Sequence, residues 1–133
     1  MGSNIDPEKY LKQARDDLNR NFLQVRYSHV YQSAAVGMDG DDFLNACCVL
    51  YGVPEKSELL VQLKALEDKH GRDRSKGAWK PRTLDLDLLM YGEEVIDDDL
   101  FRYAHVFGPA SELTSLSLPA VEEGILTQVS LRL

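Results

Sequence analysis

Leucine and aspartate alternate in the LDLDL stretch that begins at Leu84, and this pattern constrains the fold more than any other part of the chain. Neighbouring residues of a strand point to opposite faces, so the leucines share one face while Asp85 and Asp87 share the other. The leucine face has to pack against a hydrophobic core. Two carboxylates roughly 6–7 Å apart on one face repel each other unless a cation lies between them. The sequence therefore predicts a strand over residues 83–91 with one buried face and one metal-binding face.

A basic segment, residues 68–82, lies directly before this strand. It holds six Lys or Arg residues against two Asp residues, a net charge of +4, whereas the whole chain has a net charge of −7. A positive cluster in an acidic protein favours one small polyanionic ligand and argues against a nucleic-acid surface. Carboxylates that hold a divalent cation beside a group of cationic side chains are what a nucleoside triphosphate requires.

The length of 133 residues predicts a single domain, residues 1–133, that can bury a core without disulfides. Cys47 and Cys48 are adjacent in a predicted strand, so they point to opposite faces and are expected to be free thiols. Free thiols are typical of a reducing compartment. The sequence shows no apolar run that could span a membrane and no signal-peptide pattern. These features predict a cytoplasmic protein without membrane or nucleic-acid partners.

The rest of the sequence predicts helices and strands in mixed order. Residues 7–21 carry an apolar stripe at helical spacing, with Asp6 as the N-cap and Pro7 at the first helical position. Aromatic and β-branched residues predict strands over residues 23–32 and 43–51, and leucine spacing predicts a second helix near residues 55–70.

The C-terminal part gives weaker signals. Residues 95–96 suit the return arm of a hairpin, Pro109 and Pro119 bracket a short helix, and the final ILTQVSLRL suits a last strand. This order of elements predicts an α+β sandwich, in which helices pack on one side of a mostly antiparallel sheet.

Four stretches together resemble one protein family. They are GSN at residues 2–4, FLNA at 43–46, the E…GR.R pattern at 67–74, and W.PRTLDLDLLMYG at 79–92. In this order they resemble the 6-hydroxymethyl-7,8-dihydropterin pyrophosphokinase family, and PRTLDLD is the most specific of them. The resemblance implies a ferredoxin-like α+β fold. It also implies an enzyme of folate biosynthesis that transfers pyrophosphate from ATP to the pterin hydroxymethyl group, releases AMP, and uses two Mg²⁺ ions.

The resemblance further implies roles for individual residues in catalysis and in phosphate binding. Asp85 and Asp87 would hold both magnesium ions, and Asp85 would also border the pterin. Arg74 and Arg82 would close over the triphosphate, with Arg72 in support. Phosphoryl transfer depends mainly on positioning and on neutralisation of phosphate charge, and these five residues would provide both.

The remaining site residues would contact the two substrates. Glu67 and His105 would contact ATP. On the pterin side, Phe43 would stack on the ring, Asn45 would bond its edge, and Trp79 would seal the pocket. Phe43 and Asn45 are two residues apart in a predicted strand and share a face. Ordinary structural roles stay open: Phe43 in the core, Asn45 bonded to a neighbouring loop, and Trp79 fixing its own loop.

The chain also departs from the family pattern. The family has an interior strand before GSN, where this sequence has Met1 alone, so the final ILTQVSLRL or a partner chain would have to fill that place. A monomer is expected, with a dimer as the alternative in the second case. Residues 33–37 lack the expected proline, and residues 107–111 lack the expected arginine. Two other functions stay open: a homologue that acts on another small alcohol, and a nucleotide-binding module without catalysis.

Overall fold

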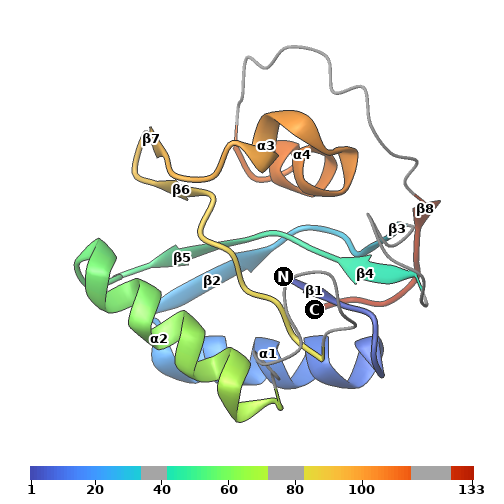
Figure 1. Ribbon diagram of the computed structural model, residues 1–133, viewed down its shortest axis with the longest axis horizontal. Coiled ribbons are helices and arrows are strands. Elements are labelled where there is room, and N and C mark those ends of the chain that lie inside the picture. The colour runs from blue at the N-terminus through green and yellow to red at the C-terminus, as the bar shows by residue number, and fades with distance from the viewer. Residues whose placement is uncertain (34–41, 72–82, 115–126) are drawn as a thin grey trace.

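A computed structural model describes residues 1–33, 42–71, 83–114 and 127–133 of the chain (Figure 1). The helices described are α1 (Pro7–Asn21), α2 (Lys56–Lys69), α3 (Asp99–Arg102) and α4 (Ala104–Ser111). The strands described are β1 (Gly2–Ser3), β2 (Gln24–Tyr27), β3 (Tyr31–Ser33), β4 (Phe43–Asn45), β5 (Cys48–Tyr51), β6 (Met90–Tyr91), β7 (Glu94–Val95) and β8 (Thr127–Gln128).

Every strand pairing in the described residues is antiparallel. One sheet has the order β1-β4-β3-β8, a second pairs β2 with β5, and a hairpin pairs β6 with β7. The helices and antiparallel sheets confirm the predicted α+β class. The hairpin predicted around Gly92 is confirmed as well, and Gly92 has the positive φ of 62° that suits a tight turn.

Two predicted long strands are each divided into two shorter ones. Residues 23–32 form β2 and β3, and residues 43–51 form β4 and β5. The breaks lie opposite each other. At this point the backbone N–H of Cys47 donates to the Ser28 hydroxyl at 2.9 Å, while the backbone N–H of Ser28 donates to the Cys47 carbonyl. A serine side chain thus replaces one backbone partner, and the regular ladder stops there. Both cysteines are free, as predicted.

Helices cover both faces of the sheets (Figure 1). α1 and α2 lie on one face, and the shorter α3 and α4 lie on the other. The prediction of helices on one side is therefore wrong for the C-terminal part. Pro109 lies inside α4, so this helix begins before the proline and not after it as predicted, while Pro119 lies outside the described residues. Asp6 precedes α1, but within the described residues its side chain makes no capping hydrogen bond.

The main core lies between α1, α2 and the sheets. Leu11 and Leu18 come from α1, Leu59 and Leu63 come from α2, and all four are buried. Leu84 and Leu86 complete this cluster, with exposed fractions of 0% and 8%, as the alternating sequence predicts. Burial of one leucine side chain contributes about 2 kcal/mol to stability.

The predicted strand over residues 83–91 is regular only at its end, in β6, whereas residues 83–89, the aspartate segment, run beside β1 and make one isolated bridge at Asp85. Gly2 and Asp85 exchange two backbone hydrogen bonds, 2.9 Å from Gly2 N to Asp85 O and 2.8 Å in the reverse direction. β1 consists of Gly2 and Ser3 of the GSN stretch itself and lies between β4 and the aspartate segment, so it does not replace the interior strand expected before GSN. The C-terminal β8 pairs instead with β3, so the expectation that it fills this place is wrong. Of the helices described, none has the length and apolar character needed to cross a bilayer.

Candidate active site

Three carboxylates from two separate elements converge into what we call the carboxylate triad. Glu67 comes from the last turn of α2, and Asp85 and Asp87 come from the aspartate segment. One oxygen of each carboxylate lies within 4.8 Å of the others. Glu67 is buried, Asp85 is half-buried and Asp87 is exposed. The triad is therefore open to solvent on the side of Asp87.

A hydrogen bond fixes Glu67 to the aspartate segment. Its Oε2 accepts from the backbone N–H of Leu86 at 2.7 Å. Leu86 lies between the two aspartates in sequence, so this bond places the glutamate beside both of them. The sequence predicted that Glu67 contacts ATP, but it did not predict that Glu67 lies beside Asp85 and Asp87. The available signal was a glutamate at the end of a helix, directly before the basic segment.

The electrostatics of the triad favour a bound cation. Partial removal from water raises the pKa of Asp87 to about 6, with repulsion by the Asp85 carboxylate as the next cause and Glu67 as a smaller one. Three hard oxygen donors within reach of one another, with solvent on the side of Asp87, match the ligands Mg²⁺ prefers, since this ion keeps several waters in addition to carboxylates. The residues present therefore fit a magnesium site.

A row of directly opposed residues crosses the sheet toward the triad. Tyr31 lies opposite Asn45, Asn45 opposite Gly2, and Gly2 opposite Asp85. Directly opposed residues of paired strands point to the same face of a sheet. Asn45 and Asp85 therefore lie on one face, and between them Gly2 contributes no side chain.

Gly2 makes room for the two pterin candidates on β4. A Cβ atom at Gly2 would lie 3.2 Å from Asn45 Oδ1 and 3.6 Å from Phe43 Cδ1. The Asn45 amide nitrogen donates to the hydroxyl of Ser33 at 2.7 Å, so one of its hydrogen bonds is made inside the protein. Asn45 therefore makes a structural hydrogen bond, to strand β3 and not to a loop as expected. Its amide oxygen lies above Gly2, where no side chain fills the space. The sequence marked Gly2 only as part of GSN.

His105 lies in the first turn of α4. Its ring stacks on Tyr103, with 5.2 Å between the ring centroids. Burial lowers the pKa of His105 below its usual value, and the carboxylate that opposes this shift belongs to Asp99 of α3. The described contacts of His105 are thus with the α3–α4 part of the chain, and its contact with ATP stays a prediction.

The other predicted site residues, Arg72, Arg74, Trp79 and Arg82, lie outside the described residues. The chain leaves the described part at Gly71 and returns at Thr83. A Cβ atom at Gly71 would lie 3.9 Å from the Thr83 hydroxyl, so the two points are adjacent. Both lie within four residues of a triad member in sequence.

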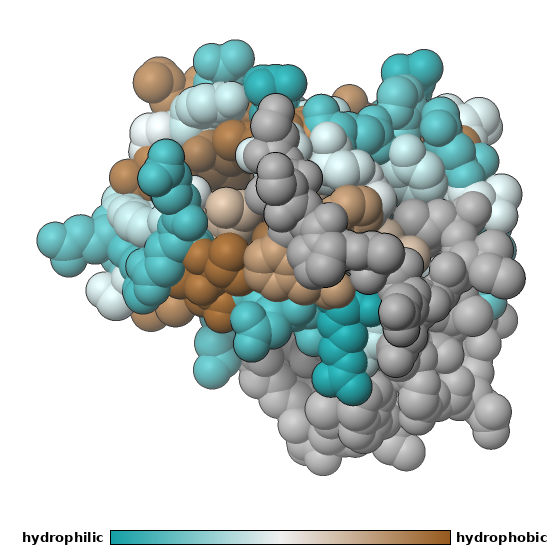
Figure 2. All heavy atoms as spheres, turned by 90° about the horizontal axis from the view of Figure 1, so that it is seen from above, coloured by the Kyte–Doolittle hydropathy of each residue, from teal (hydrophilic) through white to brown (hydrophobic). Residues whose placement is uncertain are grey.

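An apolar cavity of about 590 Å³ opens beside Asp87. Its walls come from β5, from residues 86–92 and from the α3–α4 side, and the cavity reaches the main core, where Leu18 of α1 and Leu59 and Leu63 of α2 line it. Asp87 is the one charged side chain among the described residues that line it. Figure 2 shows this side of the molecule, with hydrophobic side chains reaching the surface between hydrophilic ones. Such a cavity suits a flat ring whose charged substituent points to the triad.

Comparison with known proteins gives one consistent family. The family described as 7,8-dihydro-6-hydroxymethylpterin-pyrophosphokinase (HPPK) matches residues 1–116. The chain belongs to this family. The HPPK match includes the triad, β4 and α4, and it agrees with the α+β fold and with an enzyme that is a pyrophosphokinase.

Curated relatives agree with the HPPK assignment. The 2-amino-4-hydroxy-6-hydroxymethyldihydropteridine pyrophosphokinase of Aquifex aeolicus is 31% identical over 129 residues, 95% of this chain and 79% of the relative. The enzyme of the same name from Haemophilus influenzae is 33% identical over 109 residues, 79% of this chain and 68% of the relative. The one from Pseudomonas putida is 34% identical over 109 residues, 79% of this chain and 89% of the relative.

Proposed function

We propose that this protein transfers the pyrophosphoryl group of ATP to the hydroxymethyl group of 6-hydroxymethyl-7,8-dihydropterin in folate biosynthesis. The hydroxyl oxygen forms a bond to the β-phosphorus of ATP, and the bond from that phosphorus to the α-phosphate oxygen breaks. AMP leaves, and the hydroxyl proton is released. The observation that carries the proposal is the carboxylate triad, one member of which, Asp85, lies on the same sheet face as Asn45.

The residues of the triad bind and orient the phosphates. Asp85 and Asp87 would hold two Mg²⁺ ions, and these ions would supply charge neutralisation to the phosphate groups. Glu67 keeps the aspartate segment in place through its bond to Leu86 N. Arg72, Arg74 and Arg82 neutralise phosphate charge as guanidinium groups, which match phosphate oxygens in pairs. His105 contributes a further contact to ATP.

The two rings of the substrates bind on either side of the triad. Phe43 stacks on the pterin, the Asn45 amide bonds its edge over Gly2, and Trp79 excludes water from the pocket. The apolar cavity beside Asp87 takes the adenine base, because its walls are apolar and its single charged lining residue lies at the metal site. The hydroxymethyl group and the β-phosphate then meet between the two rings, where proximity lowers the barrier to transfer.

The test is a pterin-dependent assay for AMP. Purified protein is incubated with ATP, Mg²⁺ and 6-hydroxymethyl-7,8-dihydropterin, and AMP is measured by chromatography. We expect AMP to form only when both the pterin and Mg²⁺ are present. Asp87→Ala is expected to abolish this turnover, because one of the metal-binding carboxylates is lost while the fold stays intact.

Other results would redirect the assignment. AMP formation with a different alcohol but not with the pterin would indicate a homologue with another acceptor. ATP binding by calorimetry without AMP from any alcohol would indicate a nucleotide-binding module. Normal turnover by Asp87→Ala would show that the metal site is assigned to the wrong residues.

A further inference from the structure

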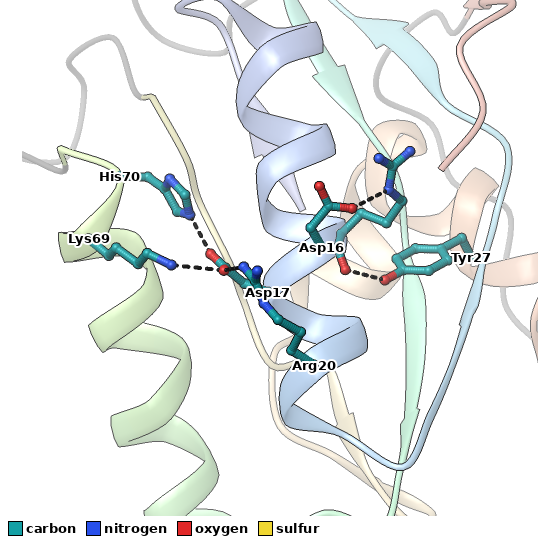
Figure 3. A network of polar contacts seen from close by, with 7 residues as sticks. Asp16, Asp17, Arg20, Tyr27, Lys69 and His70 are labelled. Carbon is teal, nitrogen blue, oxygen red and sulfur yellow. Dashed lines mark hydrogen bonds and ion pairs between the residues drawn. The ribbon is translucent and has the colours of Figure 1, made fainter.

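The last turn of α2 is tied to α1 by a buried carboxylate, Asp17 (Figure 3). Asp17 is 3% exposed, and its Oδ2 lies 2.7 Å from Nε2 of His70. Its Oδ1 accepts from Lys69 Nζ at 2.8 Å and also pairs with Arg20 of the same helix. We call Asp17, Lys69 and His70 the helix brace. It joins two helices through residues that are 52 and 53 positions apart in sequence.

His70 is the member of the brace that is buried with Asp17. It is 8% exposed, and the ring of Tyr10, also from α1, meets its ring edge-on with 6.1 Å between centroids. Burial by itself would raise the pKa of Asp17, but hydrogen bonds from Lys69, His70 and Arg20 outweigh it and hold the pKa well below its usual range. Asp17 is therefore an ionised acceptor, and its bond to His70 uses an N–H donor on Nε2.

The braced turn also carries a member of the triad. Glu67 lies three residues before His70, so the two side chains leave the same turn of α2. Asp17 holds this turn against α1, and the bond from Leu86 N to Glu67 holds it against the aspartate segment. Contacts on two sides restrict rotation and sliding of this helix end, and with it the position of the Glu67 carboxylate beside Asp85 and Asp87.

Stability alone does not account for the arrangement. Removing a carboxylate from water carries a desolvation penalty that its ion pairs only partly return, and apolar residues of similar size often stabilise a protein equally well. Lys69 and Arg20 have side chains that are 57% and 69% exposed, so their pairs with Asp17 contribute little. A directional bond between Asp17 and His70 instead fixes the position of one helix end.

We propose that Asp17 and His70 are positioning residues that, through the last turn of α2, hold Glu67 in the carboxylate triad and so set the affinity of the site for a divalent cation. The inference rests on the proposed function, because it takes the triad to be the cation site. Residues that orient metal ligands from outside typically change metal affinity about 10–100-fold when they are replaced.

The test compares two replacements of His70 that differ in one hydrogen bond. His70→Gln can present an amide N–H near the position of Nε2, whereas His70→Leu keeps similar bulk and has no donor. Mn²⁺ binding is measured by electron paramagnetic resonance in the presence of α,β-methylene-ATP, which lacks the bond that is broken in the reaction. Tyr27→Phe is the matched control, because it removes the hydrogen bonds from the Tyr27 hydroxyl to Asn19 and to the Arg15 carbonyl of α1, and leaves every hydrogen bond of the helix brace in place.

We expect His70→Leu to raise the dissociation constant of Mn²⁺ about 10-fold. His70→Gln and Tyr27→Phe should stay within about twofold of the wild type. If His70→Leu does not fold, Asp17→Asn carries the same expectation. A folded His70→Leu that is less stable but binds Mn²⁺ like the wild type would overturn the inference and leave a purely structural role. Wild-type protein that binds ATP analogue but no Mn²⁺ would overturn the metal site itself, and the inference with it.

Discussion

At the scale of single residues, the site depends on an atom that Gly2 does not have. Gly2 lies between Asn45 and Asp85 in the row of opposed residues, and its missing side chain leaves the floor between them open. A Cβ atom would come within 3.2 Å of Asn45 Oδ1, which is tighter than ordinary contact. Gly2 of β1 thus provides the space for the edge of a pterin ring, although it supplies no reacting group.

Gly2→Ala should therefore weaken pterin binding more than ATP binding. The added methyl group displaces the Asn45 amide or the Phe43 ring, and loss of a well-placed ring contact is worth on the order of 1–3 kcal/mol. We expect a rise in the KM for the pterin of about 10-fold with little change in the KM for ATP. Steady-state kinetics check this, with the exposed Ile5→Ala as control. Equal rises in both constants would indicate a general distortion of the sheet.

A second prediction at this scale concerns Asp17 and acid stability. Its folded pKa lies below the value of about 3.9 expected when unfolded, so its ion pairs stabilise the protein above that pH and are lost as the pH falls toward the folded pKa. The free energy of unfolding should fall more steeply between about pH 4 and pH 2.5 in the wild type than in Asp17→Asn.

Urea unfolding at a series of pH values measures that difference. Above about pH 5, Asp17→Asn should be less stable than the wild type by about 2 kcal/mol, because a hydrogen bond to a charged group is weakened. The gap should narrow as the pH falls. A gap that stays constant with pH would mean that Asp17 has an ordinary pKa in the folded protein.

At the scale of elements, the aspartate segment serves two purposes with alternate side chains: its leucines stabilise the fold, and its aspartates form the candidate site. Leu84 and Leu86 belong to the main core, while Asp85 and Asp87 face the cleft from the same backbone. The raised pKa of Asp87 shows that the ionised carboxylate is disfavoured in the folded protein. Without a cation, the site therefore holds a charge that opposes folding.

Asp87→Asn should for this reason be slightly more stable than the wild type when metal is removed. The gain is at most about 1 kcal/mol, since Asp87 is exposed and its charge is screened by solvent. Millimolar Mg²⁺ with ATP should raise the melting temperature of the wild type and leave that of Asp87→Asn nearly unchanged. Differential scanning fluorimetry in EDTA and in Mg²⁺ checks both points. A variant less stable than wild type in EDTA would contradict the argument.

Some features of these elements can be predicted from neighbouring residues in the sequence, and others depend on residues that are far apart. Alternation of Leu84, Asp85 and Leu86 predicts the two faces of the aspartate segment, because side-chain direction follows from the strand period alone. The breaks between β2 and β3 and between β4 and β5 depend on Ser28 meeting Cys47, which are 19 residues apart. No local propensity reports such a pairing, so two continuous strands were predicted there.

At the scale of the whole molecule, the α3–α4 unit is attached to the sheet through Glu112. One carboxylate oxygen of Glu112 accepts from the backbone N–H of His29 and contacts the His29 ring, and the other accepts from the Tyr31 hydroxyl at 2.7 Å. Tyr31 begins the row of residues that leads to the triad. The attachment therefore joins the α3–α4 unit to the strand on which this row begins.

Loss of this attachment should loosen the α3–α4 unit without unfolding the rest. In Glu112→Ala, hydrogen exchange should become faster in residues 99–111 and stay slow in α1 and α2, whose core is formed by other residues. Ser111→Ala is the matched control, since the Ser111 hydroxyl bonds to the Gly108 carbonyl within α4. Faster exchange throughout the protein would show that Glu112 supports the whole fold instead.

The long-range arrangement explains what sequence reasoning missed in the candidate site. Asp85 and Asp87 were predicted as a pair because they are neighbours in one strand. Glu67 joins them only through a turn of α2 that Asp17 braces from the other helix, and neither contact leaves a local pattern. His105 was assigned to ATP from its place after the hairpin, whereas its partners within the described residues are Tyr103 and Asp99. Its role in binding ATP stays a prediction.

The alternating faces of the aspartate segment also limit how this gene can change. One inserted or deleted codon between Thr83 and Leu89 would move every following side chain to the opposite face, so leucines would enter the cleft and carboxylates would enter the core. Folding and catalysis would be lost together, whereas a point substitution alters one face at a time. Related chains are therefore expected to differ in length before Thr83 or after the hairpin, and to have no insertion or deletion between Thr83 and Leu89.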